Sequence, residues 1–322
     1  MSPFDLNRIS GKVSKKMFKS LYHPEHVLIK KALTDQLVKK ETALFVVKVD
    51  SEHRIAFSKE FMAYHHFVEG YLNKKPYLLT FCCVCNSGMV FNPEVHQKML
   101  HFEVAGVYNG MVLMSDRETG SYWDHITGEC LHGEHKGLQL ETLHSLLVLT
   151  AEELSNHYPT SVYGLAKMSW VKRFFNIFQS RRTAATGKGF LPPFFRHSML
   201  KKDTRLPEME MGLGVWAPQQ TAVFFSMKQL KEHGGILIQS FNQQNLLIYI
   251  APLNGTPNAI YIPEAVTATW KATTLVLSNG SYIRSGKFFS KEKEALEINE
   301  PSQLFSRWYG FIATFPNATV FV

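Results

Sequence analysis

Much that would assign a function directly is missing from this sequence. It has no apolar run approaching the roughly 20 residues needed to span a bilayer. Its basic N-terminus has no continuous apolar stretch after the charges, so the layout of a secretory signal is absent. Cysteine is scarce, and three of the four cysteines crowd together at Cys82, Cys83 and Cys85, which is not a disulfide framework. These absences predict a soluble, cytoplasmic protein.

The motifs of several large function classes are missing as well. No glycine-rich loop stands between a strand and a helix, as phosphate cradles require, and no nucleophile elbow or Ser/His/Asp arrangement is present. The formal charge is +8, but the basic residues carry no nucleic-acid motif, so we expect no nucleic-acid binding. A content of 45% hydrophobic and 19% charged residues instead indicates an ordinary globular protein.

The clearest pattern along the chain is a similarity between its two halves. ALFVVKVDSEHRIAFS leads into EFMAYHHFVEGYL and KPYLLTF, and MGLGVWAPQQTAVFFS leads into MKQLKEHGGIL and QNLLIYIAP. Each half indicates two strands around a polar turn, a helical or partly helical segment, and a buried strand. Thr150, before Glu152 and Glu153, predicts the N-cap of a helix that closes the first half. We therefore expect an α+β fold of two related mixed sheet-and-helix modules from an internal duplication.

The expected domains follow from this similarity. They are a basic N-terminal segment (1–42), a first module (43–166), a connecting helix and linker (167–207), and a second module (208–322). Between Cys82 and Leu147, short apolar runs punctuated by glycine predict a β-rich insert in the first module.

The connecting segment has a character of its own. Trp170, Phe174 and Phe178 recur at helical spacing within SWVKRFFNIFQSRR, flanked by lysine and arginine. One interpretation is a connecting helix packed on the core. The other is an amphipathic helix that binds a membrane surface or a partner protein.

Cys82 and Cys85 form a Cys-x-x-Cys pair, which is the strongest chemical signal in the chain. A redox pair of the thioredoxin type sits at a helix N-terminus, and no helix start is evident here. A metal-binding knuckle between two strands fits the flanking YLLTF and GMVF better. The residue after the second cysteine of a knuckle often needs a left-handed conformation, which Asn86 tolerates. Thiol redox chemistry and two inert buried thiols remain alternatives.

A closed zinc site needs two further ligands, and no second cysteine pair exists. Histidine supplies the candidates: His65 and His66 on the segment before the cysteine strand, and His125 in the β-rich insert. Thiolate with imidazole favours zinc or copper. The sequence predicts such a site, with an open position that a small-molecule substrate would use.

Spaced motifs around these cysteines resemble a known family. TFCCVCNSGMVF is followed by MVLMSDRETGSYWDHITG and a glycine-rich turn, and the chain closes with FPNATVF. From about Ala43 to Phe321 this resembles the bacterial family called domain of unknown function 3179. Cys82 and Cys85 match its cysteine pair; Asp116, Arg117, Thr119, Ser121 and Trp123 match its second motif; Gly128, Gly133 and Gly137 match its third. The resemblance implies a family and no activity.

The chain departs from the family pattern in several places. Cys83 stands where proline is usual, Asn86 where glycine is usual and His125 where glutamine is usual, and a His-Glu pair common upstream appears here as His65-His66. Asp116, Arg117 and Trp123 are the catalytic candidates, because an arginine at a strand end binds carboxylate or phosphate. The other interpretation is that Asp116 caps a turn and Trp123 belongs to the core. An enzyme and a non-enzymatic binding or scaffold module are both consistent with these residues.

Overall fold

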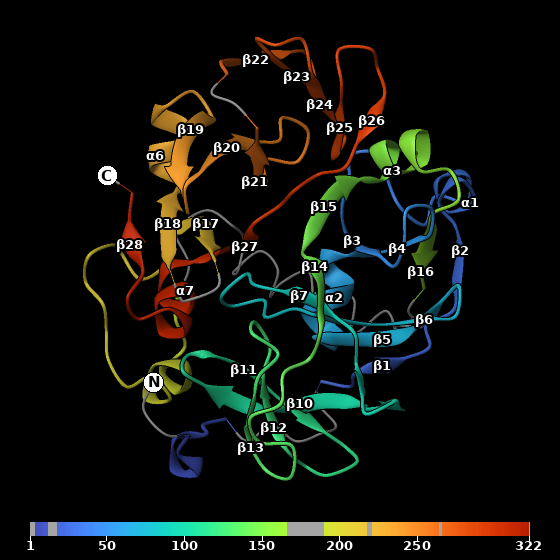
Figure 1. Cartoon of the computed structure of the whole chain (residues 1–322). Helices are drawn as coiled ribbons and strands as arrows, with labels where there is room; N and C mark the ends of the chain where they lie inside the picture. The colour runs from blue at the N-terminus through green and yellow to red at the C-terminus, as the bar shows by residue number, and fades with distance from the viewer. Residues whose placement is uncertain (1–3, 12–17, 166–189, 218–220, 264–265, 322) are drawn as a thin grey trace.

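In the computed structural model, the structure describes residues 4–11, 18–165, 190–217, 221–263 and 266–321. Within these described residues, strands account for 44% and helices for 14%, so the fold is mainly β. Six sheets are arranged as a six-bladed β-propeller (Figure 1). A short ribbon of β8 (Glu94–Val95) and β9 (Lys98–Met99) extends from one of them.

The first three blades are built from the N-terminal half of the chain. Blade 1 has the order β15 (Leu147–Thr150), β3 (Ala43–Lys48), β4 (Arg54–Ser58), β16 (Val162–Gly164) and β2 (His26–Leu28). Blade 2 has the order β1 (Leu21–Tyr22), β5 (Phe67–Leu72), β6 (Lys75–Thr80), β7 (Met89–Phe91) and β14 (Thr142–Ser145). Blade 3 has the order β10 (Phe102–Tyr108), β11 (Met111–Asp116), β12 (Tyr122–Asp124) and β13 (Cys130–His132).

The other three blades follow in the C-terminal half. Blade 4 has the order β27 (Ser302–Arg307), β17 (Met211–Trp216), β18 (Ala222–Ser226) and β28 (Thr319–Val320). Blade 5 has the order β19 (Ile236–Phe241), β20 (Gln244–Ile250) and β21 (Pro257–Ile262). Blade 6 has the order β22 (Ala268–Lys271), β23 (Thr274–Leu277), β24 (Tyr282–Arg284), β25 (Lys287–Phe289) and β26 (Ala295–Leu296).

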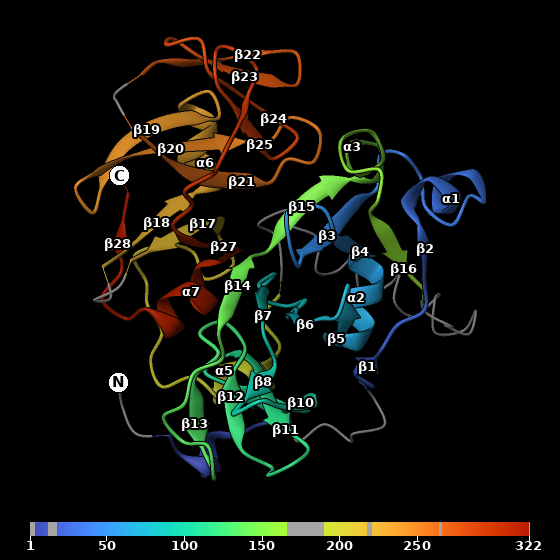
Figure 2. The same ribbon diagram turned by 45° about the vertical axis from the view of Figure 1, so that its right-hand side comes forward.

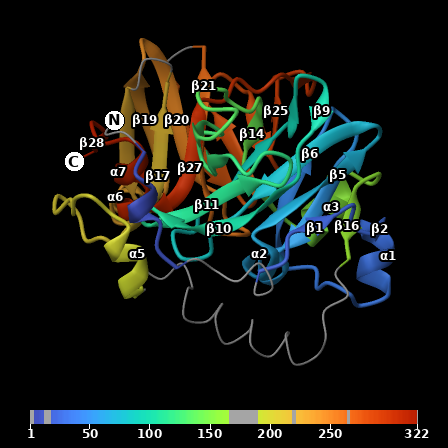
Figure 3. The same cartoon turned by 90° about the horizontal axis from the view of Figure 1, so that it is seen from below.

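Hydrogen bonds between the first and last blades close the ring. The Tyr158 hydroxyl donates to the Ser285 carbonyl at 3.0 Å, and Lys287 Nζ donates to the His157 carbonyl at 3.1 Å. On the opposite side of blade 1, β14 of blade 2 lies beside β27 of blade 4 (Figure 2), where Gln303 N–H donates to Ser145 Oγ at 3.1 Å. Seen from below, blade 3 lies between blades 2 and 4 (Figure 3).

The described α-helices are short and stand at strand ends rather than forming a layer. They are α1 (Ile29–Thr34), α2 (Lys59–His65), α3 (Ala151–His157), α5 (Pro193–His197), α6 (Met227–Glu232) and α7 (Trp308–Thr314). Ser58 and Ser226 cap α2 and α6 by accepting backbone N–H bonds. The predicted N-cap at Thr150 is confirmed, because Thr150 and Glu153 form a reciprocal capping box.

The expected α+β fold of two mixed modules is wrong, because the chain forms one mainly β propeller. The expected internal duplication of two modules is also wrong. The similar segments are strands of separate blades, and blades 1, 2 and 4 are completed by distant segments: β15 pairs with β3, β14 with β7, and β27 with β17. The largest apolar cluster joins residues of both expected modules, including Phe91 and Trp308. This cluster joins the two halves, and further apolar clusters lie within each half, so the apolar surface is not buried in two separate mixed layers.

The structure also contains two strands, β5 and β19, in segments that were predicted to be helical or partly helical. β5 and β19 each open a two-residue hairpin, whose turn residues Asn73-Lys74 and Asn242-Gln243 have positive φ near +50° and +60°. Such turns match the twist of paired strands, and asparagine favours their first position.

The expected membrane or partner helix at Trp170–Phe178 lies outside the described residues. Within the described chain, no helix has the length and apolar character to cross a membrane.

Candidate metal centre

The Cys-x-x-Cys segment forms a tight turn between β6 and β7. Cys82 N–H donates to the Ser87 carbonyl at 2.7 Å, and Ser87 N–H donates back to the Cys82 carbonyl at 3.2 Å. Asn86 has φ +55°, the left-handed conformation expected after the second cysteine of a knuckle. The strand–knuckle–strand arrangement predicted from the sequence is therefore present.

Three buried side chains converge at this turn. The sulfurs of Cys82 and Cys85 and one ring nitrogen of His125 all lie within 4.8 Å of one another. Each of these residues is at most 1% exposed. Two thiols and an imidazole at this separation can bind one transition-metal ion.

His125 reaches the thiols from blade 3. It follows β12, in a turn held by Asp124, whose Oδ1 accepts the backbone N–H groups of Ile126 and Thr127, each at 2.8 Å. Thr80, two residues before Cys82, donates its hydroxyl to the His125 carbonyl at 2.9 Å. This hydrogen bond therefore connects the cysteine turn of blade 2 to the His125 turn of blade 3.

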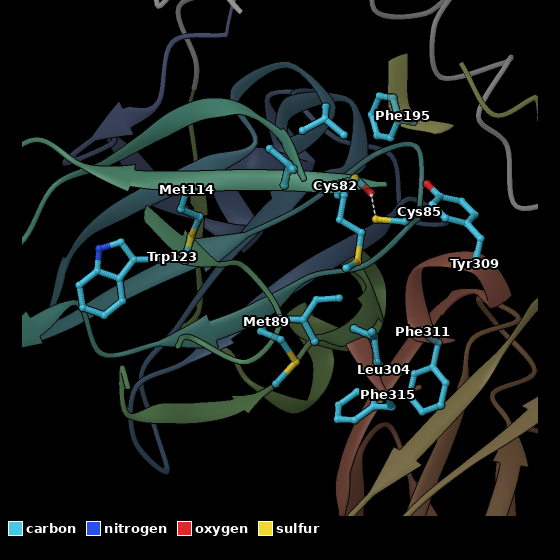
Figure 4. Packing of buried hydrophobic residues seen from close by; sticks show 14 of the residues in the cluster. Cys82, Cys85, Met89, Met114, Trp123, Phe195, Leu304, Tyr309, Phe311 and Phe315 are labelled. Carbon is cyan, nitrogen blue, oxygen red and sulfur yellow. Dashed lines mark hydrogen bonds between the residues drawn. The ribbon is translucent and has the colours of Figure 1, made fainter. Parts of the chain in front are cut away.

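Two hydroxyl groups accompany the thiols. Ser87 Oγ lies 2.7 Å from Cys85 Sγ and 3.0 Å from His125 Nε2. The Tyr309 hydroxyl lies beside Cys85 (Figure 4), is buried and has no hydrogen-bond partner among the described residues. Burial and the neighbouring Cys85 raise the pKa of Tyr309 well above its usual value, so it is a neutral donor. Sequence reasoning missed Tyr309, because it lies 224 positions after Cys85 and belongs to no motif.

The two thiols differ in acidity. Burial opposes ionisation of Cys82, but hydrogen bonds from the Cys85 thiol and backbone outweigh it and lower the Cys82 pKa. Burial, together with interaction with Cys82, raises the pKa of Cys85 well above its ordinary value. Cys82 is therefore the more acidic of the two thiols. Burial also lowers the pKa of His125 to about 4, which keeps its imidazole neutral, as a metal ligand must be.

The knuckle is fastened from blade 4. Buried Arg307 donates from Nε to the Val84 carbonyl at 2.9 Å, and its backbone N–H donates to the Cys85 carbonyl at 2.9 Å. Asn86 donates to the Phe305 carbonyl at 3.2 Å. A Cβ atom on Gly310 would lie 3.1 Å from Cys85 Cβ, a tight contact that the absence of a side chain on Gly310 avoids. The thiols are thus held before any ligand binds, which lowers the entropic cost of binding.

Sulfur is abundant around the site. The apolar cluster that contains Cys82 and Cys85 also contains Met89, Met111, Met114, Cys130 and Met209. Met111 Sδ would lie 3.5 Å from a Cβ atom on Gly310, on the same side of α7 as Cys85. Soft, polarisable groups therefore surround the thiols.

The structure does not bring the other predicted ligands into this group. His65 Nδ1 lies 2.6 Å from the Lys19 carbonyl, and His66 Nδ1 lies 2.8 Å from the Phe81 carbonyl. Among the described residues, the group that can hold a metal contains His125 and neither of these two. Cys83 faces a different apolar cluster, and burial raises its pKa to about 12.

The candidate catalytic residues lie within a turn of blade 3. Asp116 accepts from the Trp123 indole at 2.8 Å and from the Thr119 hydroxyl at 2.8 Å, so both of its oxygens are engaged. Arg117 projects from the turn, with its guanidinium 5.5 Å from the Tyr22 ring. None of these three residues belongs to the metal-ligand group found within the described chain.

The propeller and its buried Cys₂His cluster at the junction of blades 2, 3 and 4 define a candidate metalloprotein. The chain belongs to the family described as protein of unknown function (DUF3179), whose sequence model matches residues 20–316. The resemblance found from the cysteine and Asp-Arg motifs is thereby confirmed. Comparisons with curated proteins and with solved structures give no match.

Proposed function

We propose that this protein binds one soft transition-metal ion, copper(I) or zinc, through Cys82, Cys85 and His125. The observation that supports this proposal is the convergence of three buried ligand atoms within 4.8 Å. Thiolate and imidazole select copper and zinc over magnesium and calcium, which prefer oxygen ligands.

Two features of the site favour different ions. Two thiolates and a neutral imidazole form a neutral complex with Zn²⁺, which suits an apolar interior. Three soft ligands with methionines nearby suit copper(I), since structural zinc sites have four ligands. The hydroxyls of Ser87 and Tyr309, which neighbour Cys85, are the candidates for a fourth zinc ligand.

Elemental analysis of protein purified without a metal-affinity tag tests the proposal. We expect one equivalent of copper or zinc in the wild type and less than a tenth of that in the Cys82→Ser, Cys85→Ser double variant. Cys83→Ser and Cys130→Ser are matched controls, because both replace buried cysteines outside the ligand group and should keep the metal. Competition between zinc and cuprous ion for the reduced protein then identifies the ion.

A thiol-redox function is the second candidate, favoured by the closeness of the two sulfurs and by the lowered pKa of Cys82 beside the raised pKa of Cys85. Because both thiols are at most 1% exposed, a substrate disulfide reaches them only if the blade junction opens. Wild-type protein that takes up neither zinc nor cuprous ion, but forms a Cys82–Cys85 disulfide with mild oxidant, would reject the metal proposal and support this one.

A further inference from the structure

We infer that the cavity enclosed by five of the six blades binds a small organic monocarboxylate, with the Arg54 guanidinium as its anion-binding group. This inference does not rest on the proposed metal site, since neither Cys82, Cys85 nor His125 lines the cavity.

The cavity is large enough for a small molecule. Its volume is about 420 Å³, within the range of roughly 300–1,000 Å³ that is typical of ligand sites. Strands β3, β4, β14, β15, β17, β21, β25, β26 and β27 contribute lining residues, and blade 3 contributes none. The site therefore lies where the inner parts of five blades meet, as ligand sites between packed units commonly do.

Arg54 is a buried cation without an anionic partner. It is 6% exposed; Nη1 donates to the Ser51 carbonyl at 2.8 Å, and the guanidinium lies 4.0 Å from the centre of the Tyr158 ring. Its Nε has no hydrogen-bond partner, and no carboxylate forms an ion pair with it in the described part of the chain. Asp50 is the acidic residue that interacts electrostatically with Arg54, but its carboxylate accepts the backbone N–H groups of Glu52 and His53 within its own turn.

A second cation reinforces this imbalance. Lys287 Nζ lies 4.4 Å from the centre of the same Tyr158 ring, so two positive groups meet on one aromatic side chain. A buried arginine stays charged at neutral pH, and a buried charge is costly unless it is paired. An anion bound in the cavity would neutralise these groups.

The other charges on the wall set the charge of the ligand. Lys48, Arg54 and Lys287 oppose Glu297 and Glu300, which leaves one net positive charge. His144 adds none, because burial lowers its pKa to about 4. One net charge fits a monoanion better than a phosphate dianion.

The shape of the ligand follows from the apolar part of the wall. Phe45, Phe81 and Phe288 line the same cavity as Arg54. The planar guanidinium fork matches a carboxylate, and aromatic walls accommodate an apolar body. A carboxylic acid with an aromatic or branched aliphatic body satisfies both features.

Calorimetric titration of the full-length protein at pH 7.5 tests this inference. The probes are benzoate and 3-phenylpropionate, with benzamide, 3-phenylpropionamide and inorganic phosphate as comparisons. We expect a carboxylate to bind at least tenfold more tightly than its neutral amide and more tightly than phosphate. Arg54→Met should weaken carboxylate binding about tenfold to hundredfold, since a hydrogen-bonded charge is lost.

Arg284→Met is the matched control. Arg284 also stacks on aromatic rings, 5.9 Å from Tyr282 and 5.8 Å from Phe289, but it does not line the cavity, so its replacement should leave binding unchanged. The Cys82→Ser, Cys85→Ser variant should also keep carboxylate binding, which separates this inference from the metal proposal.

Two further variants apply if Arg54→Met does not fold. Lys287→Met should weaken carboxylate binding, and Glu300→Gln, which removes a negative charge from the wall, should strengthen it. No binding of either carboxylate at millimolar concentration, equal affinity for acid and amide, or unchanged binding in Arg54→Met would overturn the inference.

Discussion

Replacing Arg307 with methionine measures how strongly blade 4 holds the cysteine knuckle. The guanidinium donates to the Val84 carbonyl at 2.9 Å and to the Met209 carbonyl at 2.8 Å, and Arg307 is fully buried. A hydrogen bond to a charged group contributes about 1.5–3 kcal/mol. Methionine keeps the aliphatic stem but leaves both carbonyls without their donor. We expect the free energy of unfolding to fall by about 3–6 kcal/mol, out of the roughly 5–15 kcal/mol typical of a folded protein.

Urea denaturation at pH 7, followed by circular dichroism, measures this loss. Arg205→Met is the control, because Arg205 lies in the same region, donates to the Ala318 carbonyl and is 45% exposed, so its replacement should cost less than about 1 kcal/mol. Arg307→Lys, which keeps the charge but loses the planar fork, should fall between the two. A loss below about 1 kcal/mol in Arg307→Met would refute the view that these bonds hold the knuckle.

Three further outcomes follow from the structure. Asn86→Gly should be more stable in urea than Asn86→Ala by about 1 kcal/mol, because alanine is strained at φ +55° and glycine is not; equal stabilities would contradict this. Thr150→Ala should lower the unfolding free energy by about 1 kcal/mol through loss of the capping box, while exposed Thr34→Ala should change it by less than half of that. Burial raises the pKa of Glu69 to about 8, above its unfolded value of 4.5, so the unfolded state loses its proton first and wild-type stability falls as pH rises from 4.5 to 8. Glu69→Gln should remove that part of the decline, about 1.4 kcal/mol per pH unit at most; parallel pH–stability curves for the two proteins would show that Glu69 is already ionised in the folded state.

The sequence predicted the local features of the site and missed its distant ones. Cys82, Cys85 and Asn86 could be interpreted from five consecutive residues, because knuckle geometry depends on the turn itself. Only the three-dimensional structure could show which histidine lies beside the thiols. His65 and His66 are closer to the cysteines along the chain, but their rings face backbone carbonyls, whereas His125 reaches the thiols from blade 3. Arg307 and Tyr309 carry no motif, and their role depends on where β27 lies.

The predicted fold class was wrong for a related reason. Short apolar runs revealed most strands, but periodicity does not say which strands pair when β3 is completed by β15 about a hundred residues later. The hairpins at Asn73 and Asn242 could have been found, since asparagine between alternating apolar residues is a turn signal. Helices of five to seven residues then proved to be caps at strand ends, which a mixed-module interpretation overcounts.

The link between Arg307 and Val84 spans 223 positions of the chain. During synthesis the cysteines therefore leave the ribosome long before the segment that fixes their turn. Blade 4 also has to wait, because β17 is made about ninety residues before its neighbour β27. The thiols consequently pass through a period in which they are accessible and without their final neighbours. Cellular thiol chemistry, or delivery of a metal ion, can act on Cys82 and Cys85 during that period, before the last strands seal them inside the ring.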